Sequence, residues 1–150
     1  SEVSNEYECI FTLFRNPYSR LVSSYFYLKQ GGQCPPDEND ADKFVHPFDS
    51  FSDFVLNGLE QAIGHEQIHF LPQSYWITDS NGEYFIDKTE TTCDFKSLTK
   101  WISESVNGNI GQYFTNTSSH KKCNHSYDSF QIIEKVRDTY FQDITFYKNI

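Results

Sequence analysis

A nearly continuous apolar stretch at residues 7–14, YECIFTLF, runs directly into the segment RNPYSRLVSSY. Its β-branched and aromatic residues are typical of a strand buried on both faces, as in a parallel sheet. A helix should begin at once, because Asn16 can cap its first turn and Pro17 suits its first position. The helix should bury Tyr18, Leu21, Val22, Tyr25 and Leu28. Gly31-Gly32 should end it, so the segment predicts an α/β domain with 7–14 as an inner strand.

The rest of the chain predicts further helices and one hairpin. The expected elements are a loop at 33–48 with the acidic run DENDAD, a helix capped by Ser50, an irregular or strand-like segment HFLPQSYWI, a hairpin around Asn81-Gly82, and helices at about 94–106 and 127–140. The residues expected to be buried on the second and last helices are Phe51, Phe54, Val55, Leu59, Phe130, Ile133, Val136 and Tyr140. No internal repeat is visible.

Length and charge restrict the function class. The 150 residues are one domain's worth, and 17% aromatic residues can fill a core. No apolar run approaches the length of a membrane span. The net charge of −9 argues against nonspecific nucleic-acid binding, which needs a basic face. Because the chain has no methionine, even at residue 1, we expect it to be a piece of a longer protein.

Cysteines and glycosylation sequons favour a secretory compartment. The cysteines are Cys9, Cys34, Cys93 and Cys123, and they form no C-x-x-C pair, so we expect no zinc site of that kind. N-glycosylation sequons begin at Asn116 and Asn124. Disulfides are therefore expected. Three pairings are possible and the sequence does not distinguish them, although Cys9, on a buried strand, is the least favoured partner.

The polar side chains of the first helix suit an anionic ligand. At helical spacing, Asn16, Arg20, Ser23 and Tyr27 share one face, and Arg15 stands at the carboxyl end of the strand. Open α/β sheets bind ligands at that edge, and a helix N-terminus attracts anions. An arginine fork and a serine hydroxyl then predict a phosphate site. The alternative is a surface helix whose arginines pair with nearby acids.

The segment RNPYSRLVSSY resembles the 3′-phosphate-binding motif of sulfotransferases that use 3′-phosphoadenosine 5′-phosphosulfate. It is most similar to the membrane-bound carbohydrate branch, whose pattern is roughly R-D-P-x-x-R-L-V-S-x-Y; Asn16 replaces the aspartate. The resemblance implies that Arg15 and Ser23 grip the donor's 3′-phosphate, with Asn16 and Arg20 beside them. It also implies a P-loop-like sulfotransferase fold, with a short parallel sheet flanked by helices.

The resemblance continues in order along nearly the whole chain. It covers SFSDFVLNGL, HFLPQSYWI, YFIDKTETTCDFKSL and the terminal VRDTYFQDITFY, which fits a Y-x-x-D-x-x-x-F/Y pattern. It implies that His69 and Gln73 contact the acceptor sugar and that Lys121 and Lys122 contact donor phosphates. The structural alternatives are that His69 and Gln73 support the loop around Pro72, and that the two lysines belong to a basic loop.

The family's Gly-rich, Lys-bearing phosphosulfate loop has no counterpart here, because Gly58 and Gly64 have no lysine near them. We therefore expect residues 1–150 to be the C-terminal portion of a sulfotransferase-like domain that lacks this β-loop-α unit. The catalytic base is also expected upstream, and His69 is the only local candidate.

The expected function is transfer of a sulfuryl group from 3′-phosphoadenosine 5′-phosphosulfate to a carbohydrate hydroxyl, without a metal. The partner would be a glycan acceptor rather than nucleic acid, and this segment should make no membrane contact. The expected location is the Golgi lumen, in a type II membrane precursor, or outside the cell. The alternative is a non-catalytic binding or assembly protein that keeps the sulfotransferase fold.

Overall fold

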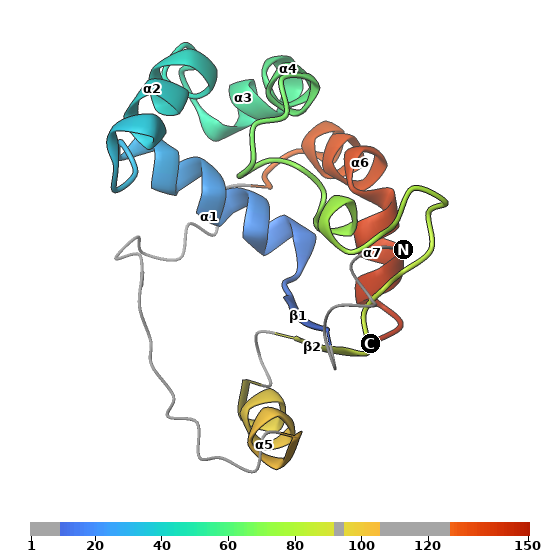
Figure 1. The fold of residues 1–150 in the computed structure, drawn as a ribbon. Helices are drawn as coiled ribbons and strands as arrows, with labels where there is room; N and C mark the ends of the chain where they lie inside the picture. Colours follow the sequence, from blue (N-terminus) through green and yellow to red (C-terminus); the bar gives the residue numbers. More distant parts are fainter. Residues whose placement is uncertain (1–9, 92–94, 106–126) are drawn as a thin grey trace.

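The computed structural model describes residues 10–91, 95–105 and 127–150 (Figure 1). The elements are β1 (Phe11–Phe14), α1 (Pro17–Lys29), α2 (Pro35–Phe44), α3 (Phe51–Asn57), α4 (Leu59–Gly64), the 3-10 helix η2 (Gln73–Trp76), β2 (Lys88–Thr91), α5 (Phe95–Ser105), α6 (Phe130–Thr139) and α7 (Phe141–Tyr147). None of the helices in these ranges is long and apolar enough to cross a membrane.

The two strands form a parallel sheet in which Phe11 pairs with Lys88 and Phe14 with Thr91. Phe11 and Phe14 point to opposite faces because side chains alternate along a strand. The Phe14 ring packs on Phe146 of α7, with centroids 4.9 Å apart, and the Phe11 ring packs on Trp101 of α5 at 6.0 Å. Helices therefore flank the sheet on both sides (Figure 1), which confirms the predicted α/β fold with a short parallel sheet.

Helix α1 begins and ends where the sequence predicts. The Asn16 side chain caps it by accepting a hydrogen bond from the backbone N–H of Ser19, and Pro17 occupies its first position. Leu21, Tyr25 and Leu28 are buried, as expected. After the helix, Gly31 and Gly32 both have positive φ angles, 90° and 66°, which favour glycine.

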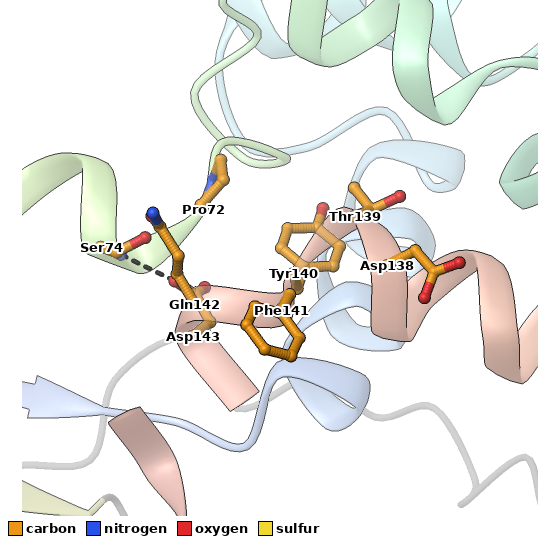
Figure 2. Close-up of a pocket in the computed structure, with 8 residues that line it drawn as sticks. All are labelled: Pro72, Ser74, Asp138, Thr139, Tyr140, Phe141, Gln142 and Asp143. Carbon is orange, nitrogen blue, oxygen red and sulfur yellow. Dashed lines mark hydrogen bonds between the residues drawn. The ribbon is translucent and has the colours of Figure 1, made fainter. Parts of the chain in front are cut away.

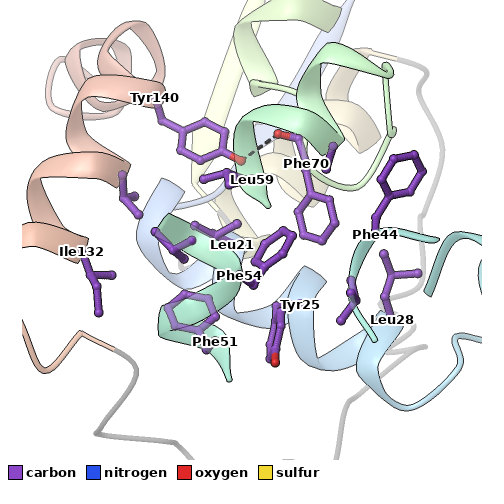
Figure 3. Close-up of a cluster of buried hydrophobic side chains, with 14 of the residues drawn as sticks. Leu21, Tyr25, Leu28, Phe44, Phe51, Phe54, Leu59, Phe70, Ile132 and Tyr140 are labelled. Atoms are coloured by element: carbon purple, nitrogen blue, oxygen red, sulfur yellow. Dashed lines mark hydrogen bonds between the residues drawn. The ribbon is translucent and has the colours of Figure 1, made fainter. Parts of the chain in front are cut away.

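The core lies between α1, α2, α3, α4 and α6 (Figure 3). Its centre is aromatic: the Phe54 ring lies 5.4 Å from Tyr25 and 4.7 Å from Phe70. The residues expected to be buried on the helix capped by Ser50 are all buried, namely Phe51, Phe54, Val55 and Leu59. Ser50 caps α3 as predicted, with its hydroxyl accepting from the backbone N–H of Asp53.

The expected loop at 33–48 is wrong, because residues 35–44 form helix α2. Pro35 and Pro36 stand in its first turn, where a missing N–H does no harm, and Asp37 and Glu38 suit its positive N-terminal end. The acidic run DENDAD thus lies on a helix that buries Ala41 and Phe44.

The predicted hairpin is reduced to a single antiparallel bridge between Thr78 and Tyr84, around a turn in which Gly82 has a φ of 81°. The preceding segment HFLPQSYWI contains the 3-10 helix rather than a strand. The strand predicted at 7–14 is shorter, because β1 begins at Phe11 and residues 7–9 lie outside the described ranges. Its burial is also incomplete, since Phe11 is 43% exposed.

The predicted buried face of the last long helix is partly wrong. Val136 and Tyr140 are buried, but Phe130 is 70% exposed and Ile133 is 38% exposed. Ile132 is buried instead, because the face at 132, 136 and 140 is the one directed at the core. This helix, α6, is followed by α7 with only Tyr140 between them.

Candidate functional site

The backbone of Arg15 is fixed by the side chain of Gln73. The N–H of Arg15 donates to Gln73 Oε1 at 2.9 Å, and the C=O of Arg15 accepts from Gln73 Nε2 at 2.8 Å. Within the described ranges, the guanidinium of Arg15 makes no hydrogen bond or ion pair. The residue is thus held by its backbone at the carboxyl end of β1, while its charged group stays available for a ligand.

Gln73 is held in turn by the buried carboxylate of Asp143, which is 0% exposed. Its oxygens accept from the backbone N–H groups of Gln73, at 2.7 Å, and Ser74, at 2.8 Å. Figure 2 shows the bond to Ser74. Both amides belong to the first turn of η2, where N–H groups have no helical partner. Asp143 of α7 therefore caps η2 and so positions the glutamine that fixes Arg15.

Arg20 and Tyr140 hold the stretch just before Gln73. Arg20 Nη1 donates to the carbonyl of Leu71 at 2.8 Å, and the Tyr140 hydroxyl donates to the carbonyl of Phe70 at 2.7 Å (Figure 3). Burial lowers the pKa of Arg20 and raises that of Tyr140. Arg20 thus ties residues 70–71 to α1, and Tyr140 ties them to the junction of α6 and α7.

Ser23 lies two turns into α1, on the same helical face as Asn16 and Arg20. It is half-buried, and within the described part of the chain its hydroxyl makes no hydrogen bond. The Tyr18 amide, in the first turn of α1, is likewise without an acceptor among these residues. Both groups are therefore free to donate to a ligand.

The structure places His69 at the other end of α1. His69 Nε2 lies 3.3 Å from Asp37 Oδ1, and its ring centroid is 5.3 Å from that of Tyr27. The hydrogen bond from the Tyr27 hydroxyl holds the pKa of the Asp37 carboxyl well below its usual range, and the Gln33 N–H adds to the effect. Arg15 precedes α1, and Tyr27 is ten residues after Pro17, or about 15 Å along the helix. The structure therefore does not bring His69 to Arg15.

Several predicted sites cannot be placed. Lys121, Lys122, Asn116 and Asn124 lie outside the described ranges, as do Cys9, Cys93 and Cys123. Cys34 is exposed and unpaired. Within the described ranges, no three His, Cys, Asp or Glu side chains are grouped to hold a metal ion.

Sequence reasoning did not predict the contacts of three residues that organise this region. Tyr140 was expected to be buried, and both it and Asp143 fitted the terminal pattern, but neither signal indicated what they contact. Asp37 stood in an acidic run that predicts a solvated loop, so nothing in the sequence indicated its bond to His69.

A pocket of about 220 Å³ lies beside η2, between Pro72 and Ser74 on one side and residues 138–143 on the other (Figure 2). A second pocket of about 190 Å³ lies next to it and shares Phe141 and Gln142 as lining residues. The pair forms a groove along the start of α7, and neither pocket is lined by Arg15 or His69.

The chain matches the model of the sulfotransferase family over residues 2–148. The matched residues include Arg15, Gln73, Tyr140 and Asp143. Gln73 bonds both Arg15 and Asp143, and Tyr140 bonds the nearby carbonyl of Phe70. No curated protein and no solved structure matches the chain. The family transfers a sulfuryl group from a sulfate donor to an acceptor. By a match over nearly its entire length, the chain belongs to the sulfotransferase family.

Proposed function

We propose that this chain carries the 3′-phosphate-binding part of a carbohydrate sulfotransferase whose donor is 3′-phosphoadenosine 5′-phosphosulfate. One observation carries the proposal. The Arg15 guanidinium has no partner among the described residues, although Gln73 fixes its backbone at the carboxyl end of β1. An arginine that is positioned but unpaired, next to a helix N-terminus, suits a phosphate dianion.

The polar groups around Arg15 have complementary roles in this proposal. The Ser23 hydroxyl supplies a second donor to the phosphate, and the Tyr18 amide supplies a third. Asn16 sets the start of the helix through its cap. Arg20 adds positive charge nearby while its own head group holds the Leu71 carbonyl.

The reaction transfers a sulfuryl group in line. The acceptor hydroxyl oxygen attacks sulfur, the bond from sulfur to the bridging phosphate oxygen breaks, and a base takes the hydroxyl proton. Adenosine 3′,5′-bisphosphate leaves. The phosphate site binds this leaving nucleotide and so orients the donor for attack. We assign no base, because the contacts of His69 with Asp37 and Tyr27 give it a structural role far from Arg15.

The remaining sequence predictions enter as parts of the same proposal. Lys121 and Lys122 would contact donor phosphates, and glycans at Asn116 and Asn124 would accompany passage through the Golgi. Gln73 would contact the acceptor only through the hydrogen-bonding positions of its side-chain amide that the two bonds to Arg15 do not use.

The net charge of −9 favours a second candidate, a non-catalytic protein that binds the nucleotide or a partner on the same fold. An acidic surface attracts an anionic glycan poorly. Residues 1–150 alone have no phosphosulfate loop, so they should transfer nothing under either candidate. Transfer of radiolabelled sulfate to a panel of glycans by the longer protein that the sequence leads us to expect separates the two, because the second candidate binds nucleotide and transfers nothing.

The phosphate site is tested by calorimetry with adenosine 3′,5′-bisphosphate and adenosine 5′-monophosphate. We expect the bisphosphate to bind more tightly. Arg15→Ala should weaken it about tenfold to a hundredfold, since a charge-assisted bond contributes about 1.5–3 kcal/mol. Ser23→Ala should weaken it less, by about fivefold, because its hydroxyl is neutral.

Arg137→Ala is the matched control. Arg137 is half-exposed, pairs with Glu134 and Asp138 on α6, and should leave nucleotide affinity unchanged on removal. Equal affinity for the two nucleotides, or normal binding by Arg15→Ala, would contradict the proposal and leave the segment a surface helix.

A further inference from the structure

We propose that the groove along the start of α7 binds an uncharged saccharide, as a subsite for acceptor units remote from the transferred sulfuryl group. The groove consists of the two neighbouring pockets of about 220 and 190 Å³. The inference rests on the proposed carbohydrate acceptor, and adds where that acceptor binds and which chemical class its bound units have.

Two partly exposed aromatic side chains line the groove, and one of them, Tyr84, also packs on Phe146 with ring centroids 4.6 Å apart. Phe141, which lines both pockets, is 64% exposed, and Tyr84, which lines the smaller one, is 46% exposed. Figure 2 shows the Phe141 ring beside Gln142 and Asp143. A pyranose ring has an apolar face of C–H groups that packs on an exposed aromatic ring, while its hydroxyls remain available at the rim.

The polar lining includes hydroxyl and amide groups. Thr78 and Thr145 line the smaller pocket, Thr139 lines the larger one, and Gln142 lines both. The Gln142 side chain is exposed and makes no hydrogen bond within the described ranges, so it can both donate to and accept from a sugar hydroxyl.

The charge of the lining selects against an anionic ligand. Among the described residues that line the two pockets there is no lysine or arginine, and Asp138 and Asp143 contribute carboxylates to the larger one. Arg137 pairs with Asp138 at 3.1 Å, but it is not one of the lining residues. A sulfated or phosphorylated sugar would therefore find carboxylates and no cation in this lining. An uncharged saccharide is not repelled by these carboxylates, and its hydroxyls can donate hydrogen bonds to them.

The position of the groove links it to the phosphate site. Pro72 and Ser74 form one wall, and Gln73 between them holds the backbone of Arg15. The groove and Arg15 are thus attached to the same short 3-10 helix. A saccharide in the groove would place the rest of its chain near the nucleotide.

The test is a titration of the full chain with lacto-N-neotetraose, a neutral tetrasaccharide, followed by saturation-transfer and amide NMR. A heparin-derived tetrasaccharide is the charged comparison. We expect the neutral sugar to bind and to shift the Gln142 side-chain amide, and the charged sugar to bind more weakly. Phe141→Ala and Gln142→Ala should each weaken binding about threefold to tenfold.

Phe130→Ala is the control, because Phe130 is also an exposed phenylalanine, at 70%, but lines neither pocket. It should leave binding unchanged. The inference is overturned if the heparin fragment binds better, if Phe130→Ala and Phe141→Ala have equal effects, or if Phe141→Ala only changes self-association in sedimentation. Nucleotide binding without saccharide binding would overturn this inference alone; the reverse result would overturn the proposed function alone.

Discussion

The side-chain amide of Gln73 bonds both the backbone N–H and the backbone C=O of Arg15, as a neighbouring strand would do in a sheet. The bonds join positions 58 residues apart. They fix the turn from β1 into α1 without using the arginine's charged group. The first prediction follows from this pairing.

Gln73→Glu should lower the free energy of unfolding by about 1–3 kcal/mol, because the carboxylate cannot donate to the Arg15 carbonyl and leaves it unpaired. Urea denaturation measures the loss. Gln61→Glu, at an exposed position on α4, is the control and should change stability by less than about 0.5 kcal/mol. Equal stability of the two variants would mean that the Gln73 bonds contribute nothing.

Asp143→Asn should destabilise the fold by about 2–3 kcal/mol, because the amide places an N–H donor against a backbone N–H at a buried position. Thermal unfolding provides the measurement. The exposed Asp138→Asn should have an effect near zero, since surface pairs contribute little. If Asp143→Asn unfolds like the parent, the carboxylate does not cap η2.

Gly32→Ala should be more damaging than Gly82→Ala. Both residues have positive φ angles, 66° and 81°, so both substitutions strain the backbone by about 1–2 kcal/mol. An added Cβ at Gly32 would lie only 2.1 Å from the Cβ of Asp37, whereas at Gly82 it would meet nothing within 4 Å. The difference in unfolding free energy between the variants therefore measures the clash, and should exceed about 1 kcal/mol.

Tyr27→Phe should change how stability depends on pH. In the folded protein the pKa of Asp37 lies well below the unfolded value of about 3.9, chiefly because of the Tyr27 hydroxyl. The ionised carboxylate therefore stabilises the fold above about pH 4, and this contribution is lost as the pH falls through the folded-state pKa. The variant should be less stable by about 1 kcal/mol at pH 7.

Its unfolding free energy should also decline less between about pH 4 and pH 2 than that of the parent, as followed by denaturant titration at each pH. Tyr75→Phe, at a half-exposed tyrosine on η2, should keep the parent's profile. Identical profiles for Tyr27→Phe and the parent would show that another group dominates the acid response.

The sequence predicted correctly those helix ends that are set by neighbouring residues. Helix α1 could be bounded correctly because Asn16, Pro17 and Gly31-Gly32 act on neighbouring backbone groups. Helix α2 was missed because Pro35 and Pro36 suggest a loop when taken alone, although proline is favoured at the start of a helix. Asp37 and Glu38 in the first turn were the signal that could have corrected it.

Where a helix has apolar residues on two faces, only the tertiary structure shows which face is buried. Ile132 and Ile133 are both apolar, and only the position of the core decides that Ile132 is buried. The candidate site is similar: Arg15 and its strand-end position follow from the sequence, but its bonds with Gln73, and those of Gln73 with Asp143, join segments far apart in the chain. Local periodicity carries no information on such pairs.

The chain of contacts from Arg15 through Gln73 to Asp143 also has a consequence for synthesis on the ribosome. Its two steps span 58 and 70 positions, so Asp143 is synthesised long after Arg15. Arg15 obtains its final position only when α7 is available to dock. Because domains tend to form from the N-terminal side as the chain grows, this turn should mature only after α7 has been made, and removing α7 should impair it.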